Sequence, residues 1–516
     1  MRFFDSDGTL LIEGPLSEAA TTFVPAEVFS QSRPLPEAKS IAVLPFSNLT
    51  ADAANESLSD GFAEEVAQAL RSIRSLRVAA PTSAFSFKDR EVDVHDVGRD
   101  LNVEVVLEGA IRCLKTRLLI TVQLVNAKSG YLLWSTRYER DMAVTFDVAG
   151  DIARSVVKTM EIPLSSQEQS YIWKRHTENA KAHQLYLKGR YYANRLTPDG
   201  LKAGVNYLNG AITEDPDYAI AYAGLAEAYY QWSFVHDRPA EAFEQVKAAA
   251  ERALDSDENL AVAHALLAVV AANYERRSEV AESRFNRALE LSPGNVLVRQ
   301  WYGSYLVTQG RLAAAIAEFG RARELDPLSP LVSVLLGHTY FFACQPHKAL
   351  EYAHKALALD KTFWLGYWSA SLAHEQLGQM MDALRLLEKA NECDDSPWIT
   401  ASKARVYARL GQREVAEAIL KDVNKRVGGR SVAPYLIATA YLALGDRDRT
   451  FEWLEKAFEE YDETLNFMAI CPLMDSCRSD PRFLDLLRRA GLDNSQAKTH
   501  IVVPVVAERL QSELGL

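Results

Sequence analysis

The sequence has little cysteine and no closely spaced cysteine pair. Its 516 residues include five cysteines, an odd number without a CxxC motif: Cys113, Cys344, Cys393, Cys471 and Cys477. Disulfide frameworks and zinc sites depend on paired cysteines at short spacing. We therefore expect reduced, largely buried thiols, and neither a disulfide scaffold nor a metal site.

Long apolar runs and basic runs are also absent. No run reaches the roughly 18 apolar residues of a membrane-spanning helix. The most apolar segment, residues 261–273, contains His264 and fits a repeat helix. The first seven residues carry two acids and no secretory signal. The net charge is −12, with no block of Lys and Arg to neutralise phosphates. These features predict a cytoplasmic protein that binds no nucleic acid and has no transmembrane segment.

The common catalytic motifs are missing as well. The sequence contains no GxxxxGKS/T, HExxH, GxSxG, HRD or DFG. Residues 5–9, DSDGT, resemble the DxDGT motif of haloacid-dehalogenase-like phosphatases, in which the first Asp is the nucleophile. The parallel strand that this motif needs is not visible, and an Asp-Gly turn in a short hairpin explains the segment more simply. We expect a protein that is not an enzyme and has no cofactor.

A repeat dominates the rest of the chain. From about residue 180 to 465, a helical-hairpin pattern recurs every 34 to 35 residues. In the copy at residues 296–327, small and aromatic residues fall where the two helices cross or turn: Gly303, Gly310, Ala315, Phe319 and Ala322. A fixed period of this size is typical of a solenoid, in which each hairpin buries its apolar face against its neighbours.

Several units agree in phase, and the pattern resembles the tetratricopeptide (TPR) family. The resemblance implies an all-α superhelical array of about eight hairpins at residues 180–465 that binds partners in its concave groove. The copies are not uniform: residues 231–239 add a longer loop, which is either functional or merely tolerated. Arg276 to Ser278 replace the usual turn glycine, and Thr450 replaces a small alanine. Within residues 466–516 we expect a capping helix, at residues 478–491, and a tail.

Residues 39–161 have a different character. Short apolar runs predict strands and 3.6-residue periodicity predicts helices, in the order β-α-β-α-β-β-β-α. The expected strands are residues 41–46, 76–80, 103–108, 117–125 and 131–138, and the expected helices are residues 57–73, 94–101 and 146–160. This order implies a small mixed α/β sheet domain with helices on one side, before the all-α solenoid.

Three blocks of this domain resemble the TolB amino-terminal-like domain, which occurs beside TPR arrays in bacterial signalling proteins. They are SIAVLPFSNLTADAANESLSDGFAEEVAQAL, VLEGAIR and TVQLVNAKSGYLLWSTRYERD. In that family an effector (a winged helix, a class III nucleotide cyclase or a kinase) commonly precedes the domain. Residues 1–38 are irregular and linker-like instead, which leads us to expect an architecture without its effector.

The sequence therefore favours a non-enzymatic regulatory or scaffold protein. The alternative is a regulatory subunit or remnant of a nucleotide cyclase, kinase or winged-helix transcription regulator whose effector is supplied in trans. An envelope-associated protein is a third interpretation, disfavoured by the lack of a signal peptide. The expected partner is a protein, such as a signalling effector.

The first helix of each TPR hairpin lines the groove, which allows the partner-binding residues to be predicted. We expect an aromatic, arginine-bearing surface without a carboxylate clamp, formed by Tyr218, Tyr229, Tyr274, His338, Phe341, Trp368, Arg405, Arg409 and Tyr435. Aromatic residues and arginine are the usual anchors of protein interfaces. The alternative interpretation is that several of these side chains pack internally against the α/β domain.

Overall fold

A computed structural model describes residues 3–4, 10–12, 39–50, 56–90, 92–114, 117–141, 148–234, 239–423 and 433–492. The chain divides into two compact units, Met1–Ala38 and Lys39–Leu516. In the first unit, strand β1 (Phe3–Phe4) pairs antiparallel with β2 (Leu10–Ile12). These are the two strands of the predicted hairpin. The acidic motif at residues 5–9 lies outside the described residues.

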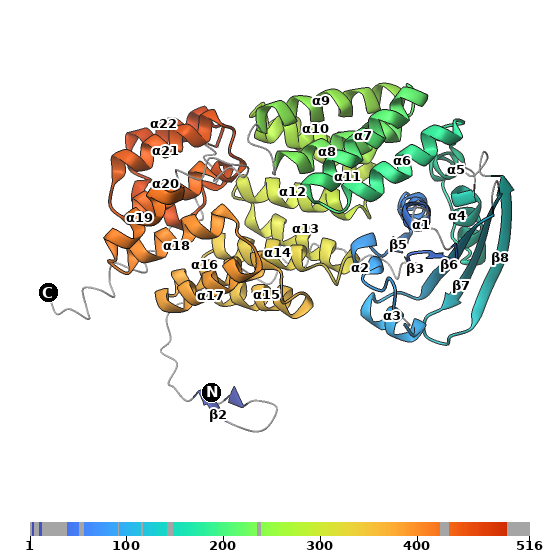
Figure 1. Ribbon diagram of the computed structural model, residues 1–516, viewed down its shortest axis with the longest axis horizontal. Coiled ribbons are helices and arrows are strands. Elements are labelled where there is room, and N and C mark those ends of the chain that lie inside the picture. Colours follow the sequence, from blue (N-terminus) through green and yellow to red (C-terminus); the bar gives the residue numbers. More distant parts are fainter. Residues whose placement is uncertain are drawn as a thin grey trace. The chain divides into compact units, whose positions relative to one another are not determined.

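The second unit begins with a mixed α/β domain (Figure 1). Its elements in chain order are β3 (Lys39–Val43), β4 (Ser47–Asn48), α1 (Glu56–Arg71), β5 (Leu76–Val78), α2 (Pro81–Phe85), α3 (Val94–Asp100), β6 (Val105–Leu114), β7 (Arg117–Asn126), β8 (Leu132–Asp141) and α4 (Val148–Thr159). The sheet order is β5-β3-β6-β7-β8, with β4 paired to β6. Strand β3 is parallel to both of its neighbours, β5 and β6, whereas β6, β7 and β8 form an antiparallel meander. The predicted mixed sheet is confirmed.

Helices cover both faces of this sheet, so the expectation of helices on one side was wrong. Ile41 of β3 packs in one cluster with Phe62 of α1 and Ile152 of α4. The next residue, Ala42, points to the opposite face and packs in a second cluster with Val97 of α3. The consecutive apolar residues Ile41, Ala42 and Val43 of β3 point to alternate faces of the sheet, so both faces need cover.

An array of paired helices follows the domain and the linking helix α5 (Ser166–Trp173) (Figure 1). The first helices of the pairs are α6 (Ala180–Ala193), α8 (Ala219–Ser233), α10 (Ala261–Asn273), α12 (Val296–Thr308), α14 (Pro330–Phe342), α16 (Trp364–Gln376), α18 (Pro397–Arg409) and α20 (Pro434–Ala443). The second helices are α7 (Pro198–Glu214), α9 (Pro239–Ser256), α11 (Ser278–Leu291), α13 (Leu312–Leu325), α15 (Pro346–Leu359), α17 (Met380–Cys393), α19 (Arg413–Val423) and α21 (Arg447–Glu459). A helical solenoid after a small sheet agrees with the sequence.

Helix crossings explain the small residues of the repeat. A Cβ atom at Gly303 of α12 would lie 2.6 Å from the ring of Phe319 on α13. Ala315 and Ala322, one turn to either side of Phe319, are completely buried. Only hydrogen and methyl side chains leave room for two backbones to approach this closely around an aromatic ring.

The turn within each of the last six hairpins contains one residue with positive φ, and these residues follow the 34-residue period. They are Arg276, Gly310, Cys344, Gly378, Gly411 and Gly445, with φ between 54° and 77°. Arg276 thus adopts the left-handed conformation that glycine adopts in four of the other turns. A cation–π contact offsets the cost of this backbone conformation, because the Arg276 guanidinium lies 3.8 Å from the ring centroid of Phe458.

The insertion at residues 231–239 mainly lengthens helices. Helix α8 has 15 residues and α9 has 18, compared with 13 in α14 and 14 in α15. Residues 235–238 lie outside the described residues.

The structure joins none of the five cysteines, all of which it describes, in a disulfide, and the expectation that they are largely buried was wrong. Cys471 and Cys477 are buried, whereas Cys344 and Cys393 are exposed. Cys344 occupies a hairpin turn, and Cys393 ends α17. Both positions face solvent because they lie at the ends of helices and not on a packed face.

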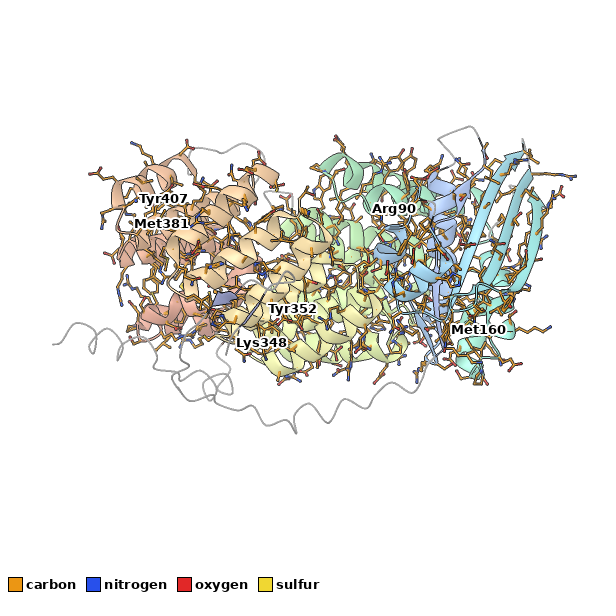
Figure 2. The ribbon with its side chains drawn as sticks, turned by 90° about the horizontal axis from the view of Figure 1, so that it is seen from below. Arg90, Met160, Lys348, Tyr352, Met381 and Tyr407 are labelled. Carbon is orange, nitrogen blue, oxygen red and sulfur yellow. The ribbon has the colours of Figure 1, made fainter. Side chains whose placement is uncertain are left out.

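Two tyrosines of the fifth hairpin, Tyr340 and Tyr352, are each covered by a lysine. Lys348 lies 5.1 Å from the ring centroid of Tyr340, and Lys355 lies 4.5 Å from that of Tyr352. Figure 2 labels Lys348 and Tyr352, both on α15. The aliphatic stems of the lysines shield these rings from water.

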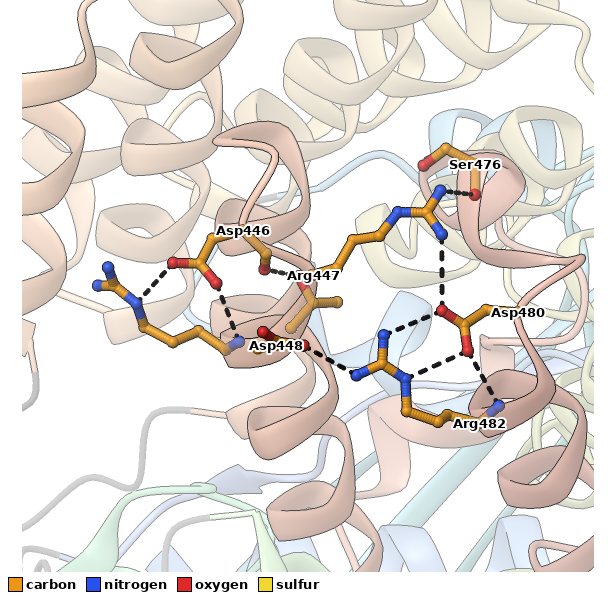
Figure 3. Close-up of polar contacts among 8 residues, drawn as sticks. Asp446, Arg447, Asp448, Ser476, Asp480 and Arg482 are labelled. Carbon is orange, nitrogen blue, oxygen red and sulfur yellow. Dashed lines mark hydrogen bonds and ion pairs between the residues drawn. The ribbon is translucent and has the colours of Figure 1, made fainter.

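The last hairpin is capped by two short 3-10 helices, η4 (Glu463–Phe467) and η5 (Pro472–Cys477), and by helix α22 (Pro481–Arg489). The helix predicted within residues 478–491 is therefore present, with Phe483 and Leu486 buried. Its first turn is tied to α21 by ion pairs, Arg482 with Asp448 at 3.1 Å and Arg447 with Asp480 at 3.5 Å (Figure 3).

Candidate functional site: a central cavity

The array curls until its last hairpin touches the middle hairpins. Tyr461, after α21, packs against Tyr274 of the third hairpin with ring centroids 4.8 Å apart. Phe467 of η4 stacks on Phe342 of the fifth hairpin at 5.2 Å. Aromatic contacts of this kind between distant segments are worth about 0.5–1.5 kcal/mol each beyond burial. They close the carboxyl-terminal side of the superhelix.

The α/β domain closes the amino-terminal side. The backbone N–H of Ala80 donates to the Leu325 carbonyl at 2.8 Å. Thr82 and Ser83 donate their hydroxyls to the two carboxylate oxygens of Asp326, each at 2.5 Å. Asp326 is almost fully buried, so the docked domain and the array share a desolvated polar contact.

These contacts border one large cavity of about 1700 Å³ that opens to solvent. Its walls are the first helices of the hairpins, helix α1 with the segment around α2, and the segments η4 and η5. Ligand pockets for small molecules typically measure about 300–1,000 Å³. The lining includes three exposed apolar residues, Leu196, Phe234 and Leu331, which mark where the cavity meets solvent.

The cavity wall is rich in aromatic residues. Trp301, Trp364, Trp368 and Trp398 all line it. The rings of Trp368 and Trp398 lie 5.6 Å apart, and the indole N–H of Trp368 donates to the Ser402 hydroxyl at 2.9 Å. Rigid aromatic side chains with satisfied polar atoms form a preorganised apolar binding surface.

The structure brings five of the nine predicted groove residues into the cavity lining: His338, Phe341, Trp368, Arg405 and Tyr435. The other four are not part of it. Tyr218 is fully buried against Tyr186 and Tyr274 packs on Tyr461, while Tyr229 and Arg409 lie elsewhere on the first helices. The partner-binding role of all nine remains a prediction.

Arg405 is committed to the array itself. Its Nε and Nη2 donate to the two carboxylate oxygens of Glu375 at 3.1 and 2.8 Å, and Nη1 donates to the Thr439 hydroxyl at 3.1 Å. Burial opposes its charge, but the carboxylate of Glu375 outweighs this and raises the pKa of Arg405. The side chain joins three successive hairpins and keeps little hydrogen-bonding capacity for a ligand.

The polar groups that the α/β domain brings to the cavity were missed by the sequence prediction. Arg190 of α6 lies between Glu64 of α1, at 2.9 Å, and Glu227 of α8, at 2.7 Å. Burial opposes the ionisation of Glu64, but the Arg190 charge outweighs it and lowers the pKa of Glu64. No sequence signal joins Glu64 to Arg190, because the sequence analysis places them in separate domains.

Several cavity residues keep a buried polar atom without a hydrogen-bond partner, among them His338 at Nε2 and Glu463 at Oε1. Burial lowers the pKa of His338 to about 4. Burial, with a smaller contribution from the neighbouring Asp462, raises the pKa of Glu463 to about 8. Both side chains are therefore neutral near neutral pH, as expected for ionisable groups in an apolar cavity.

These two shifts predict how stability depends on pH. Below 6.5 the unfolded chain protonates His338 while the folded chain does not, so stability falls as pH falls towards 4. Above 4.5 the unfolded chain ionises Glu463 while the folded chain does not, so stability falls as pH rises towards 8. The two effects oppose each other between these limits. Above 6.5 only the Glu463 loss remains, at about 1.4 kcal/mol per pH unit.

Urea unfolding near pH 6.5 and near pH 8 would measure this loss. We expect wild type to lose about 2 kcal/mol more than Glu463→Gln over that range. A variant that loses as much stability as wild type would show that Glu463 does not titrate there.

Within the described residues, no group of three or more His, Cys, Asp or Glu side chains is placed to hold a metal ion. In the same part of the chain, no helix combines the length and the apolar character needed to cross a membrane.

No protein-family model matches the chain. It is 29% identical over 253 residues to a putative adenylate cyclase 3 of Rhizobium meliloti, covering 48% of this chain and 42% of that protein. It is 21% identical over 267 residues to the transcriptional regulator HilA of Salmonella typhimurium, covering 51% and 42%. The chain thus spans less than half the length of these curated relatives. Among solved structures, the TPR protein TTC0263 of Thermus thermophilus is 25% identical, with a TM-score of 0.29, covering 38% of this chain and 97% of that one.

Proposed function

We propose that the chain is a regulatory scaffold that binds a segment of a partner protein in its central cavity. The observation that carries this proposal is the cavity itself, whose aromatic walls come from the first helices of successive hairpins. The volume of the cavity exceeds that of ordinary small-molecule pockets. Tryptophan is enriched among the hot-spot residues that dominate the binding energy of protein interfaces. The proposed role is cytoplasmic and non-enzymatic.

The amino-terminal domain belongs, in this proposal, to the TolB amino-terminal-like class. The sequence blocks at residues 40–70, 106–112 and 121–141 support this assignment, together with the mixed sheet that they form. Its role would be to complete the cavity, since Glu64 and the α2 segment contribute to the lining.

A charged side chain placed in the wall tests the proposal. Ser304 lies on the cavity side of α12 and is only half-buried, whereas Ser283 lies exposed on α11 and outside the cavity lining. We expect Ser304→Arg to lose most of the partner captured by wild type, because it fills and charges the cavity. The matched variant Ser283→Arg is expected to retain it.

Quantitative mass spectrometry of proteins captured on the full-length chain would measure the difference. Thermal unfolding of both variants would verify that each remains folded. Equal capture by wild type and by folded Ser304→Arg would refute binding in the cavity.

A second candidate is a regulatory part that works with a nucleotide cyclase or a transcription regulator in trans. The names of the two curated relatives favour it. It predicts that the captured partner is such an effector and that its activity changes when the chain is added. An unrelated partner, or an effector whose rate is unchanged by the chain, would exclude this candidate.

A further inference from the structure

We propose that the partner segment in this cavity carries a basic side chain among apolar residues, and that the carboxylate of Glu463 receives its positive charge. This inference rests on the proposed function and names the chemistry of the occupant. It commits to a lysine- or arginine-bearing protein segment.

Glu463 is an acid without a basic partner. Its Oε1 is buried with no hydrogen bond, and its side-chain hydrogen bond is to the neutral amide of Asn273. Other acids of the lining have partners: Glu64 and Glu227 pair with Arg190, Asp60 with Lys88 and Asp257 with Lys174, and Asp326 accepts from two hydroxyls. Because no cation offsets its desolvation, this carboxyl group is held in its neutral form, and a ligand that supplies a cation would allow it to ionise.

The surroundings of Glu463 suit the aliphatic stem and the charge of a basic residue. Tyr230 and Trp301, which line the same cavity, pack edge to face at 5.5 Å. Phe342 and Phe467 stack on each other in the same lining, and Phe467 belongs to the same 3-10 helix as Glu463. Aromatic faces attract cations and cover the methylene groups of lysine.

The groups around Glu463 leave its charge uncompensated. Asp462 accepts from the backbone N–H groups of Tyr435 and Thr464, each at 2.9 Å, and so stays in place as a second acid. Tyr230 from α8 and Tyr435 from α20 are phenols whose pKa is raised by burial. On α21, Lys456 pairs with Glu460 at 3.8 Å. A bound cation is thus the group that completes the site.

Binding should release a proton. Because burial holds the pKa of Glu463 at about 8 in the unliganded chain, the carboxyl group is protonated near neutral pH. The lysine ammonium is stable only beside the ionised form, so the proton leaves to solvent as the ion pair forms. The affinity is then expected to rise about tenfold per pH unit up to about pH 8, and to level off above it.

The test is isothermal titration calorimetry of the full chain with two capped peptides. In one, a lysine is flanked by leucine and phenylalanine; in the other, norleucine replaces the lysine. We expect the lysine peptide to bind at least about tenfold more tightly. Its enthalpy should depend on the buffer's ionisation enthalpy, reporting proton release. Glu463→Gln should abolish the preference and the release, while Glu459→Gln, an exposed acid outside the lining, should keep both.

The outcomes separate the two proposals. Equal binding of both peptides by wild type would overturn the basic-residue inference while leaving cavity binding intact. Binding of neither peptide would count against both. If phenethylamine binds as tightly as the lysine peptide and depends equally on Glu463, the occupant is a small amine, which overturns the commitment to a protein segment.

Discussion

Replacing Glu375 by alanine is expected to lower the free energy of unfolding by about 3–5 kcal/mol, the loss typical of breaking a buried ion pair. Arg405 is only 1% exposed and would keep an unpaired charge between three hairpins. Chemical denaturation followed by circular dichroism would measure the loss.

An exposed pair in the next hairpin provides the control. Arg413 and Glu417 lie 2.9 Å apart on α19, and Glu417→Ala is expected to cost no more than about 1 kcal/mol. The double variant Glu375→Leu, Arg405→Met should be more stable than Glu375→Ala, because it removes both charges and keeps the volume. If Glu375→Ala were no more damaging than Glu417→Ala, the buried pair would not hold the hairpins together.

Asp326→Ala is expected to detach the α/β domain from the array. The substitution removes the acceptors of both Thr82 and Ser83 and leaves the buried Ser83 hydroxyl without its carboxylate partner, at a cost of about 3 kcal/mol. Hydrogen exchange should then speed up in α1 and α2 before it does in the array. The cavity would open on that side.

Asp360 is the matched control, because it occupies the same position one repeat later. It accepts only from its own turn, through Thr362 N at 2.8 Å and the Thr362 hydroxyl at 2.7 Å. Asp360→Ala should therefore cost about 1 kcal/mol and leave the domain docked. Equal exchange in the two variants would mean that Asp326 is not the link.

Much of the fold could be predicted from local patterns. Gly303 and Phe319 identified a hairpin because two crossing helices need a small residue opposite a ring. The period predicted the turns, and where glycine was missing Arg276 still took the left-handed conformation. Helix α3 was predicted, but the face of the sheet that it covers was not. The apolar residues of β3 do not indicate which helix packs on which face.

The site was harder to predict. Trp368 and Phe341 were identified as groove residues from their place on first helices, and they line the cavity. Tyr218 and Tyr274 satisfied the same rule and do not, because their positions at helix caps turn them towards neighbouring rings. Arg405 was predicted as an interface anchor because arginine is common at interfaces. Its guanidinium instead donates to Glu375, a residue 30 positions away in the sequence.

By itself, the sequence determined the local units: a sheet domain with apolar strands, then hairpins with one period. Those units follow from interactions between residues close in sequence, which composition and spacing reveal. Only the tertiary structure decided that the last hairpin contacts the middle hairpins and that the α/β domain docks against the array. The contacts responsible, such as Ser83 with Asp326 and Arg276 with Phe458, join residues 243 and 182 positions apart. They depend on the small rotation added at every hairpin, which sums to closure only over the whole array.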